Sequence, residues 1–505
     1  MDDNKTALTD RLWLGISRAY KNNKTPFLAA LLTGLLAHGF AFTNKLLNHD
    51  EIESLFGKGA TVTSGRWGLE LVKVLFPDWS MPWIYGIISV VLLAVSVCLI
   101  VRILGIGSKP LQALLGALML AFPSVTGTFC FMFTSSAYAF AFLSAVGSVY
   151  VYRFSRKLRL PLSVLLLVAA LGIYQAYISV AACLYMLLMI EDALDRDSSP
   201  VRIVLFGLKA LAMMAVSIAV YYGITQLVFL VTGAEFNSYV TDNVNGSVSL
   251  LRRVRMAYDS FLYVFEFRNF ALITTEASRY IHIILGALIL LGLGAIAWRN
   301  RKPLNAALLL VLIALLPLAI ECMYLIMSKE SIHTLVIYSF TTVYMLAIIV
   351  IERLPGRAGR VYRDALSLLL AVVALANVYY ANMVYLKLDL QYENASTFYT
   401  SLCAQIKDTD GFDENSRLAV IGQLDNLLYI PEELDTGLMM GPAHDLVNIY
   451  SRENFFRYYL GFEIPFASED ELAMLENDSR VAAMSEYPYY GSVQKIDDYI
   501  VVKLG

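Results

Sequence analysis

Charged residues are scarce in this sequence of 505 residues, because Asp, Glu, Lys and Arg make up only 16% of it. Soluble domains contain about 25% charged residues on average. Hydrophobic residues account for 58% of the chain, and its mean hydropathy is +0.60. A soluble enzyme of this length would expose far more charge. The composition therefore predicts an integral membrane protein and excludes a disordered or fibrous one.

Cysteine is rare, and the usual cysteine motifs are missing. None of the five cysteines forms a CxxC pair. This pattern excludes a zinc site and a disulfide framework, and it predicts that the cysteines are small buried hydrophobic residues. The first apolar run, 27–42, lacks the small-residue cleavage site of a signal peptide. The sequence also contains no P-loop, no GxSxG, no HExxH and no GxGxxG followed by a helix. A transferase built from this chain is therefore not expected to hold a nucleotide donor in a Rossmann domain.

The charges are unevenly distributed along the chain. Residues 389–505 contain 21 acidic and 7 basic residues, a net charge of −14, whereas residues 1–388 have a net charge of +11. This difference predicts a basic transmembrane domain, 1–388, followed by an acidic soluble domain, 389–505. Nucleic-acid binding is excluded, because the soluble part has the wrong sign of charge.

Ten apolar segments are candidate membrane spans, since a helix needs about 20 apolar residues to cross the hydrocarbon core. Lys and Arg concentrate in cytoplasmic loops, so the basic N-terminal segment is expected to be cytoplasmic. The other basic clusters also face the cytoplasm if segment 161–190 crosses the membrane twice. The candidate spans are 25–43, 81–104, 110–123, 132–151, 161–190, 204–232, 278–298, 303–326, 334–352 and 364–386.

The polar interruption Tyr174-Gln175-Ala176-Tyr177 favours a tight hairpin within segment 161–190. The sequence thus predicts eleven spans, a cytoplasmic N-terminus and an extracytoplasmic C-terminus. Segment 110–123 is also short. Short paired helices at membrane depth are tolerated where they line protein or water, so 110–151 and 161–190 are expected to form two hairpins below a cavity that opens to the outer interface.

Three segments on the predicted outer side are longer than a connection requires: 44–80, 233–277 and 389–505. The first contains adjacent acids, Asp50 and Glu51, directly after a span. A carboxylate at the membrane–water boundary is suited to act as a general base toward an acceptor hydroxyl. The same acids also suit the first turn of a short helix, where they complement its dipole. These residues alone leave both interpretations open.

Further candidate binding residues lie in or near the outer segments. Arg66 and Trp67 belong to a predicted interfacial helix, 64–76, and Arg252 and Arg253 are basic residues on the side where positive charge is normally depleted. Arginine binds phosphate in a bidentate manner, although anchoring to lipid headgroups explains these arginines equally well. Acidic or basic side chains near the later spans are also candidates for contacting substrate: Glu321, Lys329 and His333.

The tail, 389–505, is predicted to form a small α/β domain. A helix is expected near 393–408 and a strand at 418–421. Two alternating segments, near 492–495 and 499–503, are separated by Asp497-Asp498 and indicate a hairpin.

Several short motifs occur in a fixed order along the chain. They are Asn48-His49-Asp50-Glu51, Ser64-Gly65-Arg66-Trp67, Phe122-Pro123-Ser124, Tyr174-Gln175-Ala176-Tyr177, and Tyr487-Pro488 with Gly491-Ser492-Val493 and Ile500-Val501-Val502-Lys503-Leu504. In this order the motifs resemble the glucosyltransferase II family of phage-type O-antigen glucosyltransferases. The paired acids after the first span also resemble the GT-C superfamily of membrane glycosyltransferases.

The resemblance implies an inverting transferase in the cytoplasmic (inner) membrane. Its donor would be a polyprenyl-phosphate monosaccharide, typically glucose, and its acceptor a cell-surface glycan. By motif match, Asp50 and Glu51 take the positions of the acidic pair, and Tyr174 and Gln175 join the candidate binding residues. Many family members have Asp-Asp where this chain has Asp-Glu. No cofactor follows from the sequence: a divalent metal is compatible with the family, but no metal cage is recognisable.

Other classes of membrane protein make different predictions. A transporter or flippase of lipid-linked sugars predicts internal repeats and charges deep in several spans, but no repeat is visible and Glu321 is nearly alone. A polysaccharide polymerase predicts two arginine-rich outer loops, of which the chain has one. A membrane O-acyltransferase predicts an intramembrane histidine near a cytoplasmic acyl donor, and His38 fits this role poorly.

Overall fold

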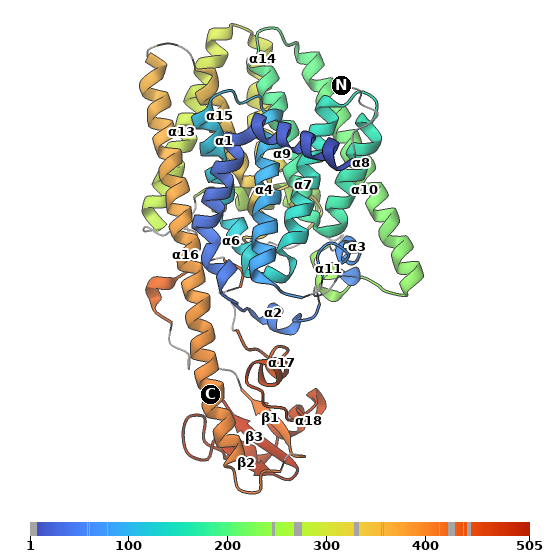
Figure 1. Ribbon diagram of the computed structural model, residues 1–505, viewed down its shortest axis with the longest axis vertical. Coiled ribbons are helices and arrows are strands. Elements are labelled where there is room, and N and C mark those ends of the chain that lie inside the picture. The colour runs from blue at the N-terminus through green and yellow to red at the C-terminus, as the bar shows by residue number, and fades with distance from the viewer. Residues whose placement is uncertain are drawn as a thin grey trace. The chain divides into compact units, whose positions relative to one another are not determined.

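The protein is mostly helical, and many of its helices are long and apolar (Figure 1). The computed structural model describes residues 8–504 except 58, 60, 78, 245–247, 267–274, 328–332, 355, 357, 414, 423–429, 438 and 442–445. Among these residues, eight helices could cross a membrane by length and composition. They comprise α1 (Leu8–Thr43), α4 (Pro82–Ile103), α7 (Met132–Phe154), α9 (Ile178–Ala193) with the preceding turn from Gln175, α10 (Pro200–Thr232), α13 (Thr275–Asn300), α14 (Pro303–Ile320) and α16 (Ala358–Lys407).

A ninth candidate span is bent. Helix α5 (Lys109–Leu120) and helix α6 (Pro123–Cys130) meet at an angle of 41°. Pro123 at the start of α6 explains this break, because a proline removes a backbone donor and clashes with the preceding helical turn. A membrane protein with several spans is therefore confirmed, whereas the count of eleven stays a prediction.

Segment 161–190 is divided where the polar interruption occurs. Helix α8 (Arg159–Ile173) ends at Tyr174, whose φ of −151° and ψ of 107° are extended rather than helical. A 3-10 turn, η2 (Gln175–Tyr177), then leads into α9. The helical part of the chain also contains shorter elements outside the candidate spans. They are η1 (Val62–Ser64), α3 (Gly68–Val72), α11 (Ser238–Asn243), α12 (Leu250–Phe265), η3 (Cys322–Leu325), η4 (Ile337–Phe340) and α15 (Thr341–Arg353).

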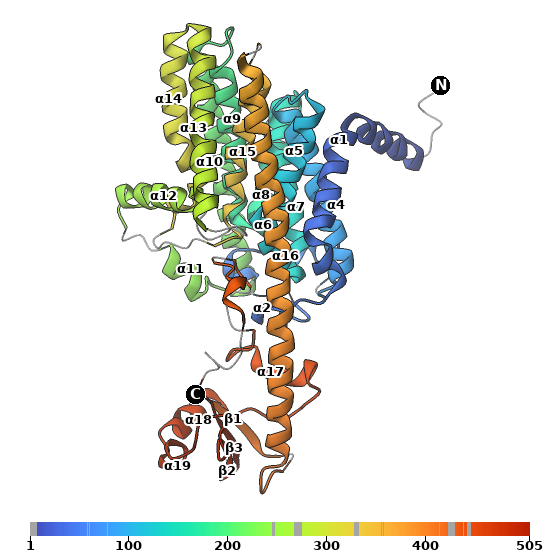
Figure 2. The same ribbon diagram turned by 90° about the vertical axis from the view of Figure 1, so that its left-hand side faces the viewer.

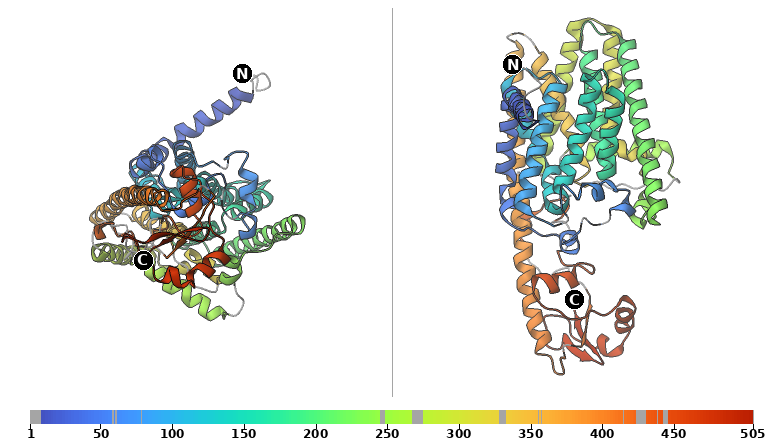
Figure 3. Two further views of the ribbon diagram at one scale, coloured as in Figure 1. Left: turned by 90° about the horizontal axis from the view of Figure 1, so that it is seen from below. Right: turned by 45° about the vertical axis from the view of Figure 1, so that its right-hand side comes forward.

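The basic segments between these helices gather at one end of the helix bundle. Glu191, at the end of α9, lies 3.8 Å from Arg153 of α7 and 3.6 Å from Arg353 of α15. Arg196 donates a hydrogen bond of 3.2 Å to Asn300 at the end of α13. Segments far apart in the sequence thus share one end, as expected if they face the same membrane surface (Figure 3).

Two helices run in directions other than that of the bundle. Helix α1 bends at Asn23, whose φ of −124° and ψ of 20° are not helical, and its first part projects from the other helices (Figure 2). Helix α12 lies across the direction of α13 and α14 (Figure 2). Its exposed face carries Leu250 and Leu251 next to arginines, which is typical of a helix in the plane of a membrane surface.

The contacts divide the chain into two units. The first contains residues 1–44, 56–382 and 437–439, and the second contains 45–55, 383–436 and 440–505. The C-terminal part was expected to be separate, but the inclusion of 45–55 in the same unit was not. The functional domain boundaries stay a prediction.

The second unit contains a three-stranded sheet in the order β1-β3-β2. Strand β1 (Arg417–Ile421) is parallel to β3 (Tyr499–Lys503), which is antiparallel to β2 (Val493–Ile496). The predicted hairpin is therefore present, and its turn contains Asp497 with a φ of 53°, as tight hairpins favour. The short helices of this unit are α2 (His49–Glu53), η5 (Glu432–Leu434), α17 (Arg452–Asn454), η6 (Phe455–Tyr459), α18 (Glu469–Glu476) and α19 (Ser479–Ala482).

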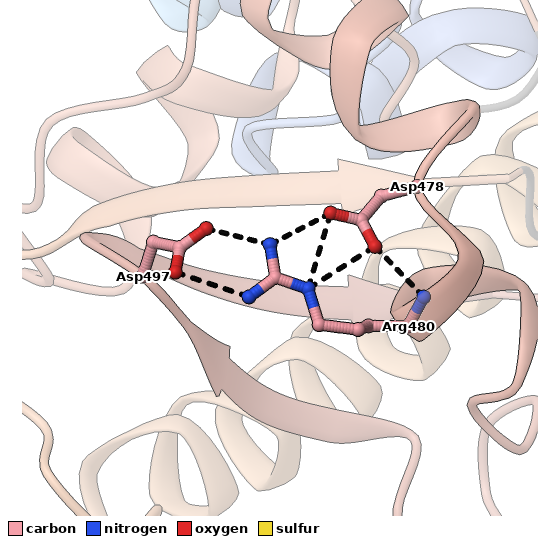
Figure 4. Close-up of polar contacts among 3 residues, drawn as sticks. All are labelled: Asp478, Arg480 and Asp497. Carbon is pink, nitrogen blue, oxygen red and sulfur yellow. Dashed lines mark hydrogen bonds and ion pairs between the residues drawn. The ribbon is translucent and has the colours of Figure 1, made fainter.

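An arginine links this hairpin to a neighbouring helix (Figure 4). Arg480 of α19 donates hydrogen bonds of 2.7 Å to Asp478 and of 2.6 Å and 3.0 Å to Asp497. These contacts hold the pKa of both carboxyl groups below the ordinary value. The group is solvent-exposed, so we assign it to the local order of the sheet rather than to chemistry.

Candidate functional site

The acidic pair lies on α2 of the second unit. Asn48 caps this helix, and its side chain accepts a hydrogen bond of 2.9 Å from the backbone N–H of Glu51. Leu47 and Ile52, on either side of the acids, are fully buried in a core that also contains Tyr399 of α16. The core of the C-terminal unit therefore positions the segment that carries the acids.

The two acids have different surroundings. The Glu51 side chain is fully buried and lies 2.6 Å from the Nζ atom of Lys45. Burial together with the Glu51 charge raises the pKa of Tyr459 in the same unit. The Asp50 side chain is 50% exposed, and its carboxylate lies 3.3 Å from Nε2 of His49. Asp50 is therefore accessible to a reactant, whereas Glu51 is held by a lysine inside the protein.

A second group of candidate residues is assembled in the first unit around Arg66. We call it the Arg66 cluster, and its members are Arg66, Tyr138, Tyr174, Gln175 and Tyr221. The Nη1 atom of Arg66 donates a hydrogen bond of 3.1 Å to the hydroxyl of Tyr138, and the guanidinium lies 5.2 Å from the Tyr174 ring centre. The rings of Tyr138 and Tyr174 stack with their centres 4.4 Å apart. Two aromatic rings thus fix the orientation of one cation.

Gln175 joins the turn before Arg66 to helix α10. Its Nε2 atom donates hydrogen bonds of 2.9 Å to the Ser64 carbonyl and of 2.9 Å to the Tyr221 hydroxyl. The Tyr221 hydroxyl in turn donates a hydrogen bond of 3.0 Å to the carbonyl of Gly65. Gly65 has a φ of 69°, and a Cβ atom there would lie 2.6 Å from that hydroxyl. Glycine is therefore required at this position, because the backbone is left-handed and there is no space for a Cβ atom.

Trp67 fixes the other side of the same turn. Its indole N–H donates a hydrogen bond of 3.1 Å to Thr225 of α10, and its ring stacks on Tyr221 with centres 6.4 Å apart. The side chain is almost fully buried. Trp67 therefore packs inside the protein and supports Arg66.

Close contact between two glycines sets the position of α3 on α8. A Cβ atom at Gly68 would lie 2.7 Å from the backbone carbonyl carbon of Gly172, and one at Gly172 would lie 2.8 Å from the Trp67 ring. Replacing Gly68 with Ala is expected to destabilise the protein by about 1–3 kcal/mol, because overpacked groups force the backbone to shift. Thermal unfolding of the purified protein measures this. Gly39→Ala is the control, since nothing lies within 4 Å of a Cβ atom there; equal stability of the two variants would contradict the packing argument.

His333 lies close enough to Arg66 for its titration to respond to the arginine. Burial and the Arg66 charge lower the pKa of His333 to about 4, so the imidazole is neutral at neutral pH. Its Nδ1 atom is buried and has no hydrogen-bond partner among the described residues. Beside the arginine, the available nitrogen of this neutral imidazole can donate one hydrogen bond to a bound ligand or accept one from it.

The other candidate residues are not brought into the Arg66 cluster. Arg253 donates hydrogen bonds to the carbonyls of Leu325 and Ile326, at 3.0 Å and 2.6 Å, and thereby ties α12 to η3. Glu321 is buried and accepts a hydrogen bond of 2.7 Å from Ser260. Arg252 lies exposed in the first turn of α12.

Lys329 lies outside the described residues. Within the described part of the chain, no group of three His, Cys, Asp or Glu side chains could hold a metal ion. The sequence interpretation missed Lys45, Tyr138 and Tyr221 as partners of the candidate residues. Tyr138 and Tyr221 are ordinary aromatic residues of apolar helices, so only their contacts distinguish them.

Comparison with known proteins supports one family. A family model described as glucosyl transferase GtrII matches residues 39–351, which is more than half of the chain. The match includes both acids and the whole Arg66 cluster. No curated protein and no solved structure matches the chain. The resemblance seen in the sequence is thereby confirmed, and the chain belongs to the glucosyl transferase GtrII family.

Proposed function

We propose that this protein is an inverting glycosyltransferase that moves a monosaccharide from a polyprenyl-phosphate donor to a cell-surface glycan. Glucose is the monosaccharide that we propose. Membership of the GtrII family implies glycosyltransferase activity. The observation that carries the finer proposal is the contrast between the exposed carboxylate of Asp50 and the buried, lysine-bound carboxylate of Glu51.

Asp50 is proposed as the general base. A single displacement requires a carboxylate that an acceptor hydroxyl can reach, and half of the Asp50 side chain is exposed. His49 lies beside it and orients the carboxylate. Glu51 is proposed as a positioning residue, because its pairing with Lys45 anchors α2 while its backbone N–H is bound by the Asn48 cap.

The Arg66 cluster is proposed to bind the phosphate of the donor. Arginine presents donors in a planar fork that matches phosphate oxygens, and the two tyrosine rings hold this fork in place. His333 adds one hydrogen bond through its buried Nδ1 atom.

The acceptor oxygen attacks the anomeric carbon, and its proton passes to Asp50. The bond between the anomeric carbon and the phosphate oxygen breaks, so the leaving group is polyprenyl phosphate. The cation of Arg66 stabilises the charge that develops on this phosphate. Attack on the face opposite the leaving group inverts the anomeric centre. Arg252, Arg253, Glu321 and Lys329 stay predicted substrate contacts.

We further propose that the chain lies in the cytoplasmic membrane with its N-terminus inside and residues 389–505 outside. Basic residues concentrate on the cytoplasmic side of membrane proteins, and the basic segments of this chain gather at one end of the bundle. Membrane lipid is then a partner around the bundle and along α12.

Transfer and lipid flipping are distinguished by the product. Purified protein is incubated with polyprenyl-phosphate glucose and a surface-glycan acceptor, and the lipids and glycan are analysed by mass spectrometry. We expect equal amounts of polyprenyl phosphate and glucosylated acceptor. Movement of intact donor across a vesicle bilayer without release of polyprenyl phosphate would instead support a flippase and contradict the proposal.

A further inference from the structure

A groove of about 860 Å³ lies between α13 and α14 and is not explained by glycosyl transfer. Its volume falls in the range of roughly 300–1,000 Å³ that is typical of small-molecule sites. Leucines from both helices form its walls, among them Leu290, Leu293 and Leu309. Helix α13 packs mainly on α15 whereas α14 packs mainly on α9, so the two consecutive helices contact each other little and leave space between them.

The mouth of the groove is positively charged. Arg301 and Lys302 connect the two helices and line the groove, and neither has an ion-pair partner among the described residues. The Nζ atom of Lys302 donates a hydrogen bond to the Arg196 carbonyl, which fixes the ammonium without neutralising it. Helix α14 begins at Pro303 with no side-chain cap, so its first turn adds the partial positive charge of a helix N-terminus.

The surroundings of the mouth are those of a membrane interface. Trp298, in the last turn of α13, lines the groove and is 85% exposed, as expected of a tryptophan at the level of lipid headgroups. Leu310, further along the groove, is 73% exposed and would face acyl chains. Apolar walls below a basic mouth match a molecule with one anionic group and a long apolar chain.

We propose that this groove is a binding site for an anionic phospholipid from the leaflet at this end of the bundle. An acyl chain lies along the leucine walls, and the phosphate contacts Arg301 and Lys302. Basic pockets between transmembrane helices bind anionic headgroups in this way. A zwitterionic lipid is disfavoured, because its cationic headgroup brings a second positive charge to a mouth that contains two.

The site is independent of the proposed reaction. None of the residues that line the groove belongs to the Arg66 cluster or to the acidic segment. Variants of the groove therefore test lipid binding separately from glycosyl transfer. The bound lipid is expected to hold helices α13 and α14 at a constant separation.

Two variants change different properties of the groove. Arg301→Asn combined with Lys302→Gln removes both charges, and Asn tolerates the left-handed backbone of Arg301, whose φ is 51°. Gly294→Leu fills the groove, because nothing lies within 4 Å of a Cβ atom at Gly294. The matched controls are Arg360→Gln, which removes an exposed cation elsewhere, and Gly223→Leu, whose added side chain also meets open space.

Binding is measured by native mass spectrometry of the full-length protein, titrated in detergent with phosphatidylglycerol or phosphatidylcholine. We expect the wild type and both controls to bind phosphatidylglycerol at least about tenfold more tightly than phosphatidylcholine. The charge variant should lose this preference, and Gly294→Leu should lose the bound lipid. Equal binding of the two lipids by the wild type would overturn the proposal, as would an unchanged preference in the charge variant. Thermal unfolding verifies that each variant is folded.

Discussion

Replacing Asp50 with Asn is expected to lower kcat for glycosyl transfer by about 10²–10⁴-fold, which is the usual contribution of a general base. Asparagine keeps the shape of the side chain but cannot take the acceptor proton. Asp50 is half exposed and asparagine keeps the Oδ1 atom that faces His49, so expression and thermal unfolding should match the wild type. The measurement is the initial rate of product formation at saturating donor and acceptor.

The same short helix offers a matched control for this variant. Glu53 is exposed and accepts a hydrogen bond of 3.0 Å from Asn454, so Glu53→Gln removes one carboxylate from α2 without touching the acidic pair. We expect nearly full activity from this control. Glu51→Gln should lower both activity and unfolding temperature, because it breaks the pairing of a buried carboxylate with Lys45. Full activity of Asp50→Asn would exclude Asp50 as the base.

The second large effect is expected at Arg66. Arg66→Gln should lower kcat/KM for the donor by about 10²–10³-fold, the range observed when one charge-stabilising donor is removed from an active site. The loss should appear in the KM for polyprenyl-phosphate glucose as well as in kcat, because the cation would contact the phosphate before and during bond cleavage. Steady-state kinetics with varied donor at fixed acceptor measure both constants.

Two further variants define what Arg66 does. Arg255→Gln is the control, since this guanidinium is 82% exposed and lies 3.4 Å from Asp259 on the same helix. Tyr138→Phe removes the hydroxyl that accepts a hydrogen bond from Arg66 but leaves the stacked rings, so a smaller loss is expected. Unchanged donor kinetics in Arg66→Gln would mean that the arginine only holds the turn between η1 and α3 in place.

The acidic pair shows which part of the candidate site could be predicted from the sequence. Adjacent acids after a span indicated a candidate general base, but the sequence left open which acid it was. The structure distinguishes the two by burial, which depends on Lys45 and on the core formed with α16. That core joins residues 45–55 to residues more than three hundred positions later, and no local pattern reports such a contact.

The sequence by itself determined that this is a helical membrane protein of several spans and that its tail contains a helix and a hairpin. It also determined which connecting segments are basic. These properties follow from hydropathy and from alternation along a strand, which are local. The tertiary structure alone decided which side chains meet. Trp67, which the sequence placed in an interfacial helix, is a buried residue that donates a hydrogen bond to Thr225; Arg253 binds carbonyl groups, and Tyr138 contacts Arg66. Such partnerships depend on helix packing between segments distant in sequence, so side-chain burial and pairing could be assigned only once the helices were placed together.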